Sequence, residues 1–375
     1  MKYYIIAGEA SGDMHAANLM SELNKLDSNV DYRCWGGDLM EAQGGKIMKH
    51  YRDLAFMGFA EVAMNIKTIA KNLSFCKADI LSYQPDVLIL IDYPGFNLRI
   101  AEFAKKQGFI VYYYISPQIW AWKKSRVHKI KKYIDKVFCI LPFEADFYAK
   151  YDYSADYVGH PLLDELRKHD HEFIYPEIEA LKSKDNRPII ALLPGSRKQE
   201  ISKMLPVMAN TMDDFPQYQF VIAGVNWQPE SLYKSAIGNR NIPIVWGQTY
   251  HLLQNSHAAL VTSGTATLET ALFGIPQVIL YKANKISYII AKQLVKGINY
   301  ISLPNLIMDR EVAKELIQLD CNPKKVSEEL KRIVELGISR DQMVSDYKEL
   351  HEKLGNGNAS LKTAKIIINT LVLEK

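Results

Sequence analysis

Asp92 is the residue of this sequence whose type and position best suit proton transfer. It closes the apolar run 85–92 and is followed by a turn containing Pro94 and Gly95. A carboxylate at the end of a buried strand can take the proton of a substrate hydroxyl as a general base. The competing interpretation is that Asp92 only caps the local turn.

Two later loops carry residue types that bind phosphate. In the first, Gly195, Ser196 and Arg197 follow the apolar run 189–193 and precede a helical pattern. Free N–H groups at a helix N-terminus favour anions, and an arginine adds a two-pronged donor. The simpler interpretation is an exposed arginine in a capped turn.

The second loop combines small hydroxyl residues with an acid. Ser263 ends the apolar run 258–263, and Gly264 and Thr265 follow it. Glu269 comes about one helical turn after Thr265, where its carboxylate can reach the paired hydroxyls of a ribose. By itself, Glu269 could equally be an ordinary acid on a helix surface. Two such loops in one domain suit a nucleoside diphosphate.

The opening loop has the sequence GEASGD, residues 8–13, directly after the apolar run 2–7. Its spacing is neither that of a dinucleotide-binding loop nor that of a P-loop. Two interpretations stay open. The loop is a tight turn in which Ser11 or Asp13 caps the next helix, or it is a glycine-rich surface against which a sugar or phosphate lies.

Two segments suit an anionic membrane surface. Segment 119–136 is strongly basic and begins with tryptophans, and segment 56–75 has apolar residues at helical spacing. Tryptophan and lysine together favour membrane interfaces, although a solvated helix face and core packing are the ordinary explanations. The residues expected to face the membrane are Val62, Ile66, Ile69, Trp120, Trp122, Lys123, Lys124 and Arg126.

The elements that position these residues are short apolar runs alternating with helical patterns. Such runs indicate parallel sheets covered by helices on both faces. The sequence therefore predicts an α/β protein with two doubly wound, Rossmann-like domains and a ligand cleft between them. We place the domains at 1–165 and 166–340, followed by C-terminal helices at 341–375 that pack back on the first domain or on a partner subunit.

Composition excludes some classes of function. The 375 residues are 48% hydrophobic and carry a net charge of +4, too small for a dedicated nucleic-acid binder. The four cysteines and nine histidines lack ligand spacing, so we expect no metal and no cofactor. No apolar run reaches the roughly 18 residues of a membrane span, so we expect a cytoplasmic protein that at most lies on a membrane.

Six motifs resemble, in order and spacing, those of the bacterial lipid-A-disaccharide synthases. They are AGEASGD (7–13), IDYPGFN (91–97), SPQIWAW (116–122), LLPGSR (192–197), SGTATLE (263–269) and SLPNLI (302–307). The resemblance implies a GT-B glycosyltransferase that works without metal at the inner face of the inner membrane. It transfers 2,3-diacylglucosamine from UDP to 2,3-diacylglucosamine 1-phosphate, which gives a β(1→6) disaccharide phosphate and UDP in lipid A biosynthesis.

The resemblance also implies roles for individual residues. Asp92 matches the catalytic base, and Arg197, Glu269 and Asn305 match residues of the donor site. The full donor set is then Gly195, Ser196, Arg197, Ser263, Gly264, Thr265, Glu269 and Asn305. The acceptor or sugar side is Gly8, Glu9, Ser11, Gly12 and Gln118. Domain 1–165 becomes the acceptor and membrane side, and a homodimer is possible.

Two other functions fit the same residues. A UDP-N-acetylglucosamine epimerase or a soluble glycosyltransferase would share the donor loops and need no membrane surface. A non-catalytic nucleotide- or nucleic-acid-binding protein would bind UDP or RNA without turnover.

Overall fold

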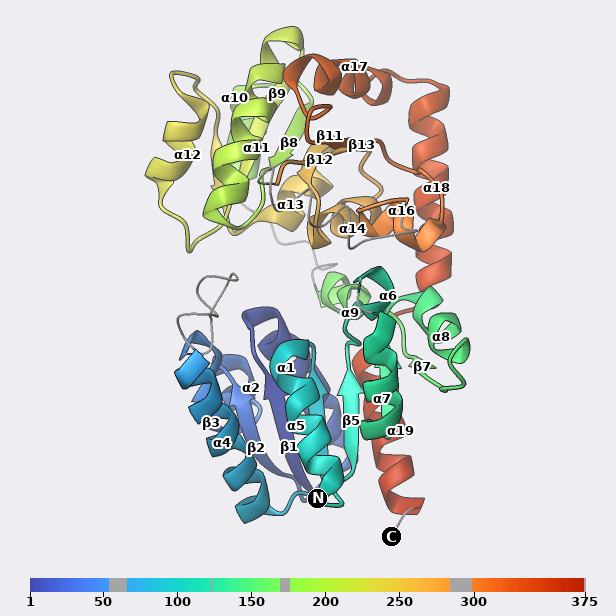
Figure 1. Cartoon of the computed structure of the whole chain (residues 1–375). Coiled ribbons are helices and arrows are strands. Elements are labelled where there is room, and N and C mark those ends of the chain that lie inside the picture. Colours follow the sequence, from blue (N-terminus) through green and yellow to red (C-terminus); the bar gives the residue numbers. More distant parts are fainter. Residues whose placement is uncertain (54–65, 123, 169–175, 284–298, 374–375) are drawn as a thin grey trace. The chain divides into compact units, whose positions relative to one another are not determined.

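The computed structural model describes residues 1–53, 66–122, 124–168, 176–283 and 299–373 (Figure 1). The chain divides into unit 1, residues 1–167 with 356–375, and unit 2, residues 168–355. Each unit contains one parallel β-sheet, which confirms the prediction of two Rossmann-like α/β domains.

Unit 1 has a seven-stranded sheet in the order β3-β2-β1-β4-β5-β6-β7. Successive residues of its strands alternate between two apolar cores, because side chains of a strand point to opposite faces. Tyr4 and Ile6 belong to one core, and Tyr3 and Ile5 belong to the other. The strands are β1 (Lys2–Ala7), β2 (Asp31–Gly36), β3 (Lys46–His50), β4 (Val87–Ile91), β5 (Val111–Tyr114), β6 (Lys136–Cys139) and β7 (Asp156–Tyr157).

Helices cover both faces of this sheet. Helices α4, α5 and α7 supply one core, and α1, α2 and α19 supply the other. The helices of unit 1 are α1 (Ala10–Leu26), α2 (Asp38–Ala42), α4 (Ile66–Tyr83), α5 (Pro94–Lys106), α6 (Ile119–Trp122), α7 (Val127–Tyr133), α8 (Pro142–Ala149), α9 (Pro161–Lys168) and α19 (Ala359–Leu373), with 3₁₀ turns η1 (Tyr51–Asp53) and η2 (Lys124–Arg126).

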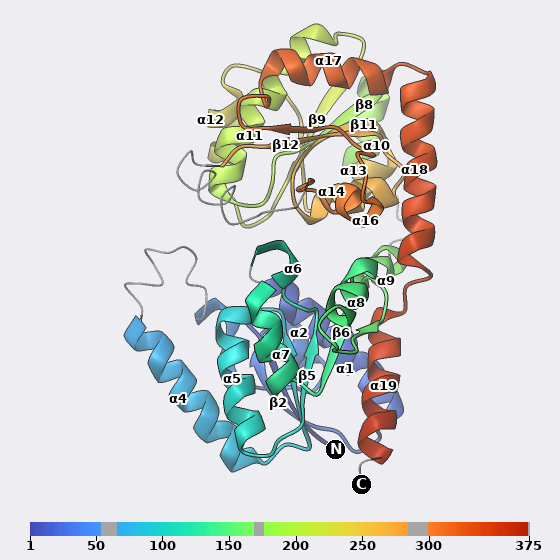
Figure 2. The same cartoon turned by 45° about the vertical axis from the view of Figure 1, so that its right-hand side comes forward.

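The C-terminal helix α19 belongs to the N-terminal unit. It packs along α1, and Figure 2 shows it beside the strands of unit 1. Ile367 and Leu371 are buried there with the β1 and α1 side chains. At the start of α19, Asp164 accepts a hydrogen bond from the Ser360 N–H at 3.3 Å, and just before the helix Arg167 donates to Asn358 Oδ1 at 3.1 Å. These contacts tie the returning chain to α9.

Unit 2 has a six-stranded parallel sheet in the order β10-β9-β8-β11-β12-β13. Its strands are β8 (Ile189–Leu193), β9 (Gln219–Gly224), β10 (Ile244–Trp246), β11 (Ser256–Thr262), β12 (Gln277–Tyr281) and β13 (Glu315–Ile317). Its helices are α10 (Pro176–Lys184), α11 (Lys198–Thr211), α12 (Glu230–Ile237), α13 (Thr249–Gln254), α14 (Thr265–Leu272), α16 (Leu303–Met308), α17 (Pro323–Val334) and α18 (Ile338–Leu354), with the 3₁₀ turn η3 (Met212–Asp214).

One predicted boundary differs from the observed division. The sequence assigns residues from 341 onward to a separate C-terminal segment, whereas α18 packs on α14, α16 and α17 and is part of unit 2. The change of unit comes at Gly355 and Gly357, whose φ values of +76° and +67° favour glycine. They interrupt what would otherwise be one long helical pattern.

Candidate functional site

The carboxyl edge of the unit 1 sheet brings the opening loop next to Asp92. Strands β1 and β4 pair in parallel with Ala7 opposite Ile91. Gly8 and Asp92 are therefore the next residues on adjacent strands. This is also the point at which the strand order of the sheet reverses. Open α/β sheets bind ligands at such a point, beyond the carboxyl ends of the strands.

Asp92 lies in an environment that suits a general base. Burial, and after it the negative charge of Glu9, raise the pKa of its carboxyl to about 6. A hydrogen bond from the Tyr93 N–H opposes both effects. Glu9 itself is exposed and is the residue immediately before α1. The carboxylate of Asp92 is thus ionised at neutral pH yet remains a usable proton acceptor.

Asp13 has a different role from the one expected. Its buried carboxylate accepts hydrogen bonds from the backbone N–H groups of Gly37 at 2.7 Å, Leu39 at 3.2 Å and Met40 at 3.2 Å. Asp13 therefore holds the start of α2, and the prediction that it caps its own helix is wrong. Ser11 is exposed in the first turn of α1.

Both glycines of the opening loop are explained by packing. A Cβ atom on Gly8 would lie 2.4 Å from Cγ of Tyr93, so the ring of Tyr93 fills that space. A Cβ atom on Gly12 would lie 3.2 Å from the Cβ of Ala7, where α1 crosses β1 closely. Both glycines are buried, which corrects the expectation that they form a surface for a sugar. Glu9, Ser11 and Gln118 are the exposed polar residues predicted for that side.

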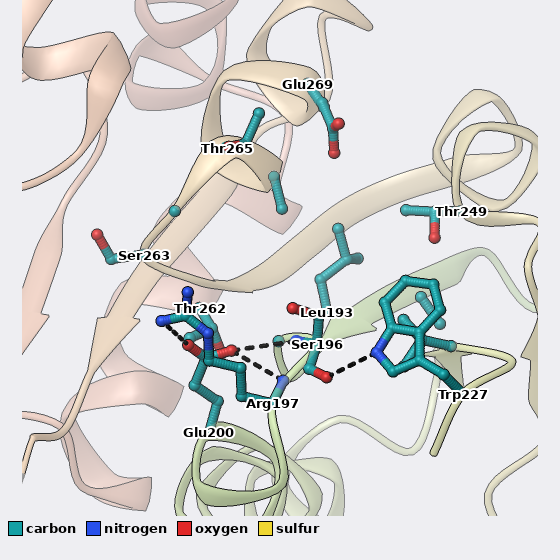
Figure 3. Close-up of a pocket in the computed structure, with 15 residues that line it drawn as sticks. Leu193, Ser196, Arg197, Glu200, Trp227, Thr249, Thr262, Ser263, Thr265 and Glu269 are labelled. Carbon is teal, nitrogen blue, oxygen red and sulfur yellow. Dashed lines mark hydrogen bonds and ion pairs between the residues drawn. The ribbon is translucent and has the colours of Figure 1, made fainter. Parts of the chain in front are cut away.

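The topology of unit 2 repeats that of unit 1. Strands β8 and β11 are adjacent at the reversal of strand order, with Leu193 opposite Val261. The loops that follow these two strands line a pocket of about 460 Å³ (Figure 3). Seven of the eight predicted donor residues line this pocket: Gly195, Ser196, Arg197, Ser263, Gly264, Thr265 and Glu269.

The Glu200 side chain accepts hydrogen bonds from two backbone amides at the start of α11. Its Oε2 accepts hydrogen bonds from the N–H groups of Ser196 at 3.1 Å and Arg197 at 3.2 Å (Figure 3). Its Oε1 lies 3.8 Å from the guanidinium of Arg197, whose side chain is 64% exposed. Glu200 therefore occupies two of the amides at this helix start, and the exposed side chain of Arg197 offers a further donor to an anion.

Glu269 is held by a tyrosine that the sequence does not single out. The Tyr250 hydroxyl donates to Oε1 of Glu269 at 3.0 Å, and burial raises the pKa of the Glu269 carboxyl. Glu269 also lines a second pocket of about 310 Å³, with Gln248, Tyr250 and Trp227. One carboxylate thus faces two neighbouring cavities.

Two further residues line this pocket: Trp227, which the sequence analysis missed, and Thr262, which precedes Ser263 in the second loop. Trp227 is 70% exposed, and its indole N–H donates to the Ser196 carbonyl at 3.2 Å. Thr262 is buried at the end of β11, and its hydroxyl has no hydrogen-bond partner within the described ranges. The signal that the sequence offered for Trp227 is a tryptophan shortly after the apolar strand, in the turn-like segment GVNWQPE (224–230).

Asn305 does not face the pocket. It is fully buried, and its Oδ1 accepts from the N–H groups of Val312 at 2.8 Å and Ala313 at 3.0 Å. Its amide donates to the Ala313 carbonyl at 2.8 Å and to Glu315 at 2.9 Å. The oxygen and the nitrogen of the Asn305 side chain thus both bond to groups of unit 2. This corrects the expectation that Asn305 contacts the donor substrate.

The residues predicted to face a membrane differ in how exposed they are. Trp120 is buried, packs edge-on against Phe143 and donates to Glu144 at 3.3 Å, so its assignment to the membrane surface is wrong. Ile69 and Arg126 are half-buried. Val62 and Lys123, and the side chains of Ile66, Trp122 and Lys124, lie outside the described residues. Within the described ranges no helix is long and apolar enough to span a membrane.

Solved structures show that the fold is shared with an epimerase and a glycosyltransferase. A UDP-GlcNAc 2-epimerase from Neisseria meningitidis, bound to UDP-GlcNAc, has a TM-score of 0.67 at 14% identity and covers 100% of both chains. The glycosyltransferase of kitacinnamycin has a TM-score of 0.66 at 12% identity and covers 99% of both chains. At these identities the likeness shows the fold alone.

Sequence comparison identifies the family. The model of the lipid-A-disaccharide synthetases matches residues 3–367. The lipid-A-disaccharide synthase of Syntrophus aciditrophicus (strain SB) is 35% identical, over 98% of this chain and 97% of its own. That of Coxiella burnetii (strain CbuG_Q212) is 34% identical, over 98% of each chain. With the six motifs and the two α/β units, these matches show that the chain belongs to the lipid-A-disaccharide synthase family.

Proposed function

We propose that this chain transfers 2,3-diacylglucosamine from UDP to 2,3-diacylglucosamine 1-phosphate, with inversion at the anomeric carbon. The products are the β(1→6) disaccharide 1-phosphate and UDP. Family membership over the whole chain carries this proposal, since the chain is a glycosyltransferase of lipid A biosynthesis. The clustering of seven predicted donor residues around one pocket of unit 2 supports it.

In the proposed donor complex, the diphosphate lies in the 460 Å³ pocket. Arg197 is exposed there and can donate to a phosphate in two-pronged fashion. The buried Thr262 hydroxyl, without a partner in the described part of the chain, gains one. Glu269 binds the ribose hydroxyls, and the neighbouring 310 Å³ pocket, which Trp227 also lines, takes the uracil.

Asp92 supplies the base in this proposal. The acceptor hydroxyl attacks the anomeric carbon of the donor while its proton passes to the Asp92 carboxylate. The new C–O bond forms as the bond from the anomeric carbon to UDP breaks, and UDP leaves with the electron pair. Positive charge at the departing diphosphate lowers the barrier, and Arg197 provides it.

Both substrates carry acyl chains, and each buried methylene contributes about 0.8 kcal/mol to membrane association. The enzyme is therefore proposed to work at the inner face of the inner membrane. Helix α4 exposes Lys67, Lys71 and Phe75 at four-residue spacing. We propose this face as part of the membrane surface. Binding to anionic vesicles should weaken in Phe75→Ser, whereas Leu336→Ser, which changes an equally apolar exposed residue of unit 2, should bind like the wild type.

The test of the reaction is incubation with both acylated substrates. Release of UDP should require both of them and should yield the β(1→6) disaccharide phosphate. Conversion of the UDP-sugar alone to its epimer would instead favour an epimerase, and UDP binding without turnover would favour a non-catalytic protein.

Two variants separate the roles of the units. Asp92→Asn should lower turnover by about 10²- to 10⁴-fold while UDP still binds. Arg197→Ala should weaken UDP binding, measured by calorimetry. Normal turnover of Asp92→Asn would remove it as the base, and unchanged UDP affinity of Arg197→Ala would contradict its assigned contact.

A further inference from the structure

The main chain at Asp92 has an unusual conformation. Asp92 and Tyr93 follow each other with φ values of +42° and +50°, the left-handed region that favours glycine. Non-glycine residues stay in this region only where surrounding contacts hold them, and such residues gather at active sites. The Asp92 N–H still bonds to the Tyr114 carbonyl at 3.3 Å, so the chain turns sharply just after the last link of the sheet.

Two buried side chains hold the carbonyl of Asp92. The Tyr113 hydroxyl, from β5, donates to it at 2.5 Å. The Asn97 amide, from the first turn of α5, donates to it at 2.7 Å and to the Ile91 carbonyl at 3.2 Å. Tyr113 and Asn97 are both fully buried. The turn is therefore anchored from the neighbouring strand and from the following helix.

The opposite side of the turn is fixed by packing. The ring of Tyr93 occupies the space that a side chain on Gly8 would need, and it stacks on Phe96 with ring centroids 5.6 Å apart. Burial holds the pKa of Tyr113 well above its usual range, so its hydroxyl keeps the proton that it donates. The turn at Asp92 is therefore held by a bond from its N–H, by two bonds to its carbonyl and by the packing of the Tyr93 ring.

We propose that Tyr113 and Asn97 are positioning residues that fix the Asp92 carboxylate in its half-buried place through the Asp92 carbonyl. The inference rests on the proposed role of Asp92 as base. Neither side chain needs to touch a substrate. Their loss lets the turn relax toward an ordinary conformation, which moves the carboxylate away from the acceptor hydroxyl.

The test compares Tyr113→Phe with Tyr153→Phe. The control removes a similar bond in the same unit, because the Tyr153 hydroxyl donates to the Ile134 carbonyl at 3.0 Å. Tyr113→Phe should lower kcat by about 10- to 100-fold, the size of effect expected from a displacement near 1 Å. It should leave UDP affinity unchanged and shift the acid limb of the kcat–pH profile to lower pH, because a released carboxylate is better hydrated. Tyr153→Phe should change none of these.

The outcomes are distinct. Wild-type kcat and pH profile in folded Tyr113→Phe, with Asp92→Asn inactive, would overturn the positioning role and leave Asp92 as the base. Full activity of Asp92→Asn would overturn both assignments. If Tyr113→Phe fails to fold, Asn97→Ala removes the second anchor and is judged by the same kcat, affinity and pH measurements.

Discussion

At the scale of single residues, the pKa of Asp92 sets the pH dependence of turnover. Burial and the Glu9 charge raise it to about 6, so the base becomes protonated as the pH falls through that value. Turnover should therefore be full above this range and be lost below it. Glu9→Gln removes one of the two causes, which should move the acid limb of the kcat–pH profile to lower pH.

Glu41→Gln is the control for that shift, because it removes an exposed acid of unit 1 that does not act on Asp92. A Glu9→Gln profile that coincides with the wild-type profile would show that Glu9 does not influence the base.

The negative charge of Glu200 should affect the binding of UDP. Its carboxylate bonds to two amides and lies next to Arg197 at the edge of the pocket. Glu200→Gln keeps an acceptor for those amides and removes a negative charge close to a bound diphosphate. UDP should bind a few-fold more tightly, in keeping with the roughly 0.2–1 kcal/mol of an exposed charge pair. Calorimetry at low and high salt measures this, and weaker binding would contradict it.

At the scale of elements, the sequence was most informative where strands are continuous and apolar. Strands Lys2–Ala7 and Ile189–Leu193 have the bounds of the apolar runs that predict them. The apolar pattern does not reveal β2 and β3, because the charged residues Arg33, Lys46 and Lys49 interrupt it. It also does not reveal β7 and β13, which are only two and three residues long. A strand toward the edge of a sheet tolerates such residues because one side is open to solvent.

At the candidate site, the sequence predicted where the loops lie but not how their polar groups are bonded. Spacing placed seven donor residues around one pocket, because the ends of adjacent parallel strands meet at one edge. It could not show that Glu200 occupies two amides or that Asn305 is used internally, since both depend on contacts within the folded loop.

The network around Asn305 ties α16 to β13, and its removal should destabilise unit 2. Asn305→Ala leaves the buried N–H groups of Val312 and Ala313 without a partner, at a cost of roughly 2 kcal/mol or more. Urea unfolding measures this. Asn322→Ala, which removes a helix N-cap and an exposed bond to the Leu319 carbonyl, should cost about 1 kcal/mol. A stable Asn305→Ala that binds UDP weakly would instead indicate direct contact with the donor.

At the scale of the whole molecule, unit 1 depends on a helix from the far end of the chain. Ile367 of α19 is fully buried against unit 1, whereas Val372 is 59% exposed. Ile367→Ala should destabilise unit 1 by about 2–5 kcal/mol, and Val372→Ala should have little effect. The unfolding of unit 2, followed by bound UDP, should stay at the wild-type position. A shift of both units together would show that they unfold as one.

The return of the chain to unit 1 also fixes an order of events during synthesis. Protein domains fold as units while the ribosome makes the chain from its N-terminus. Residues 168–355 form all of unit 2, and they emerge before α19. The first unit to be started is thus completed after unit 2, and α1 lacks its neighbour α19 until α19 itself has left the ribosome. The unit that holds Asp92 therefore gains its last helix only after all of unit 2 has been synthesised.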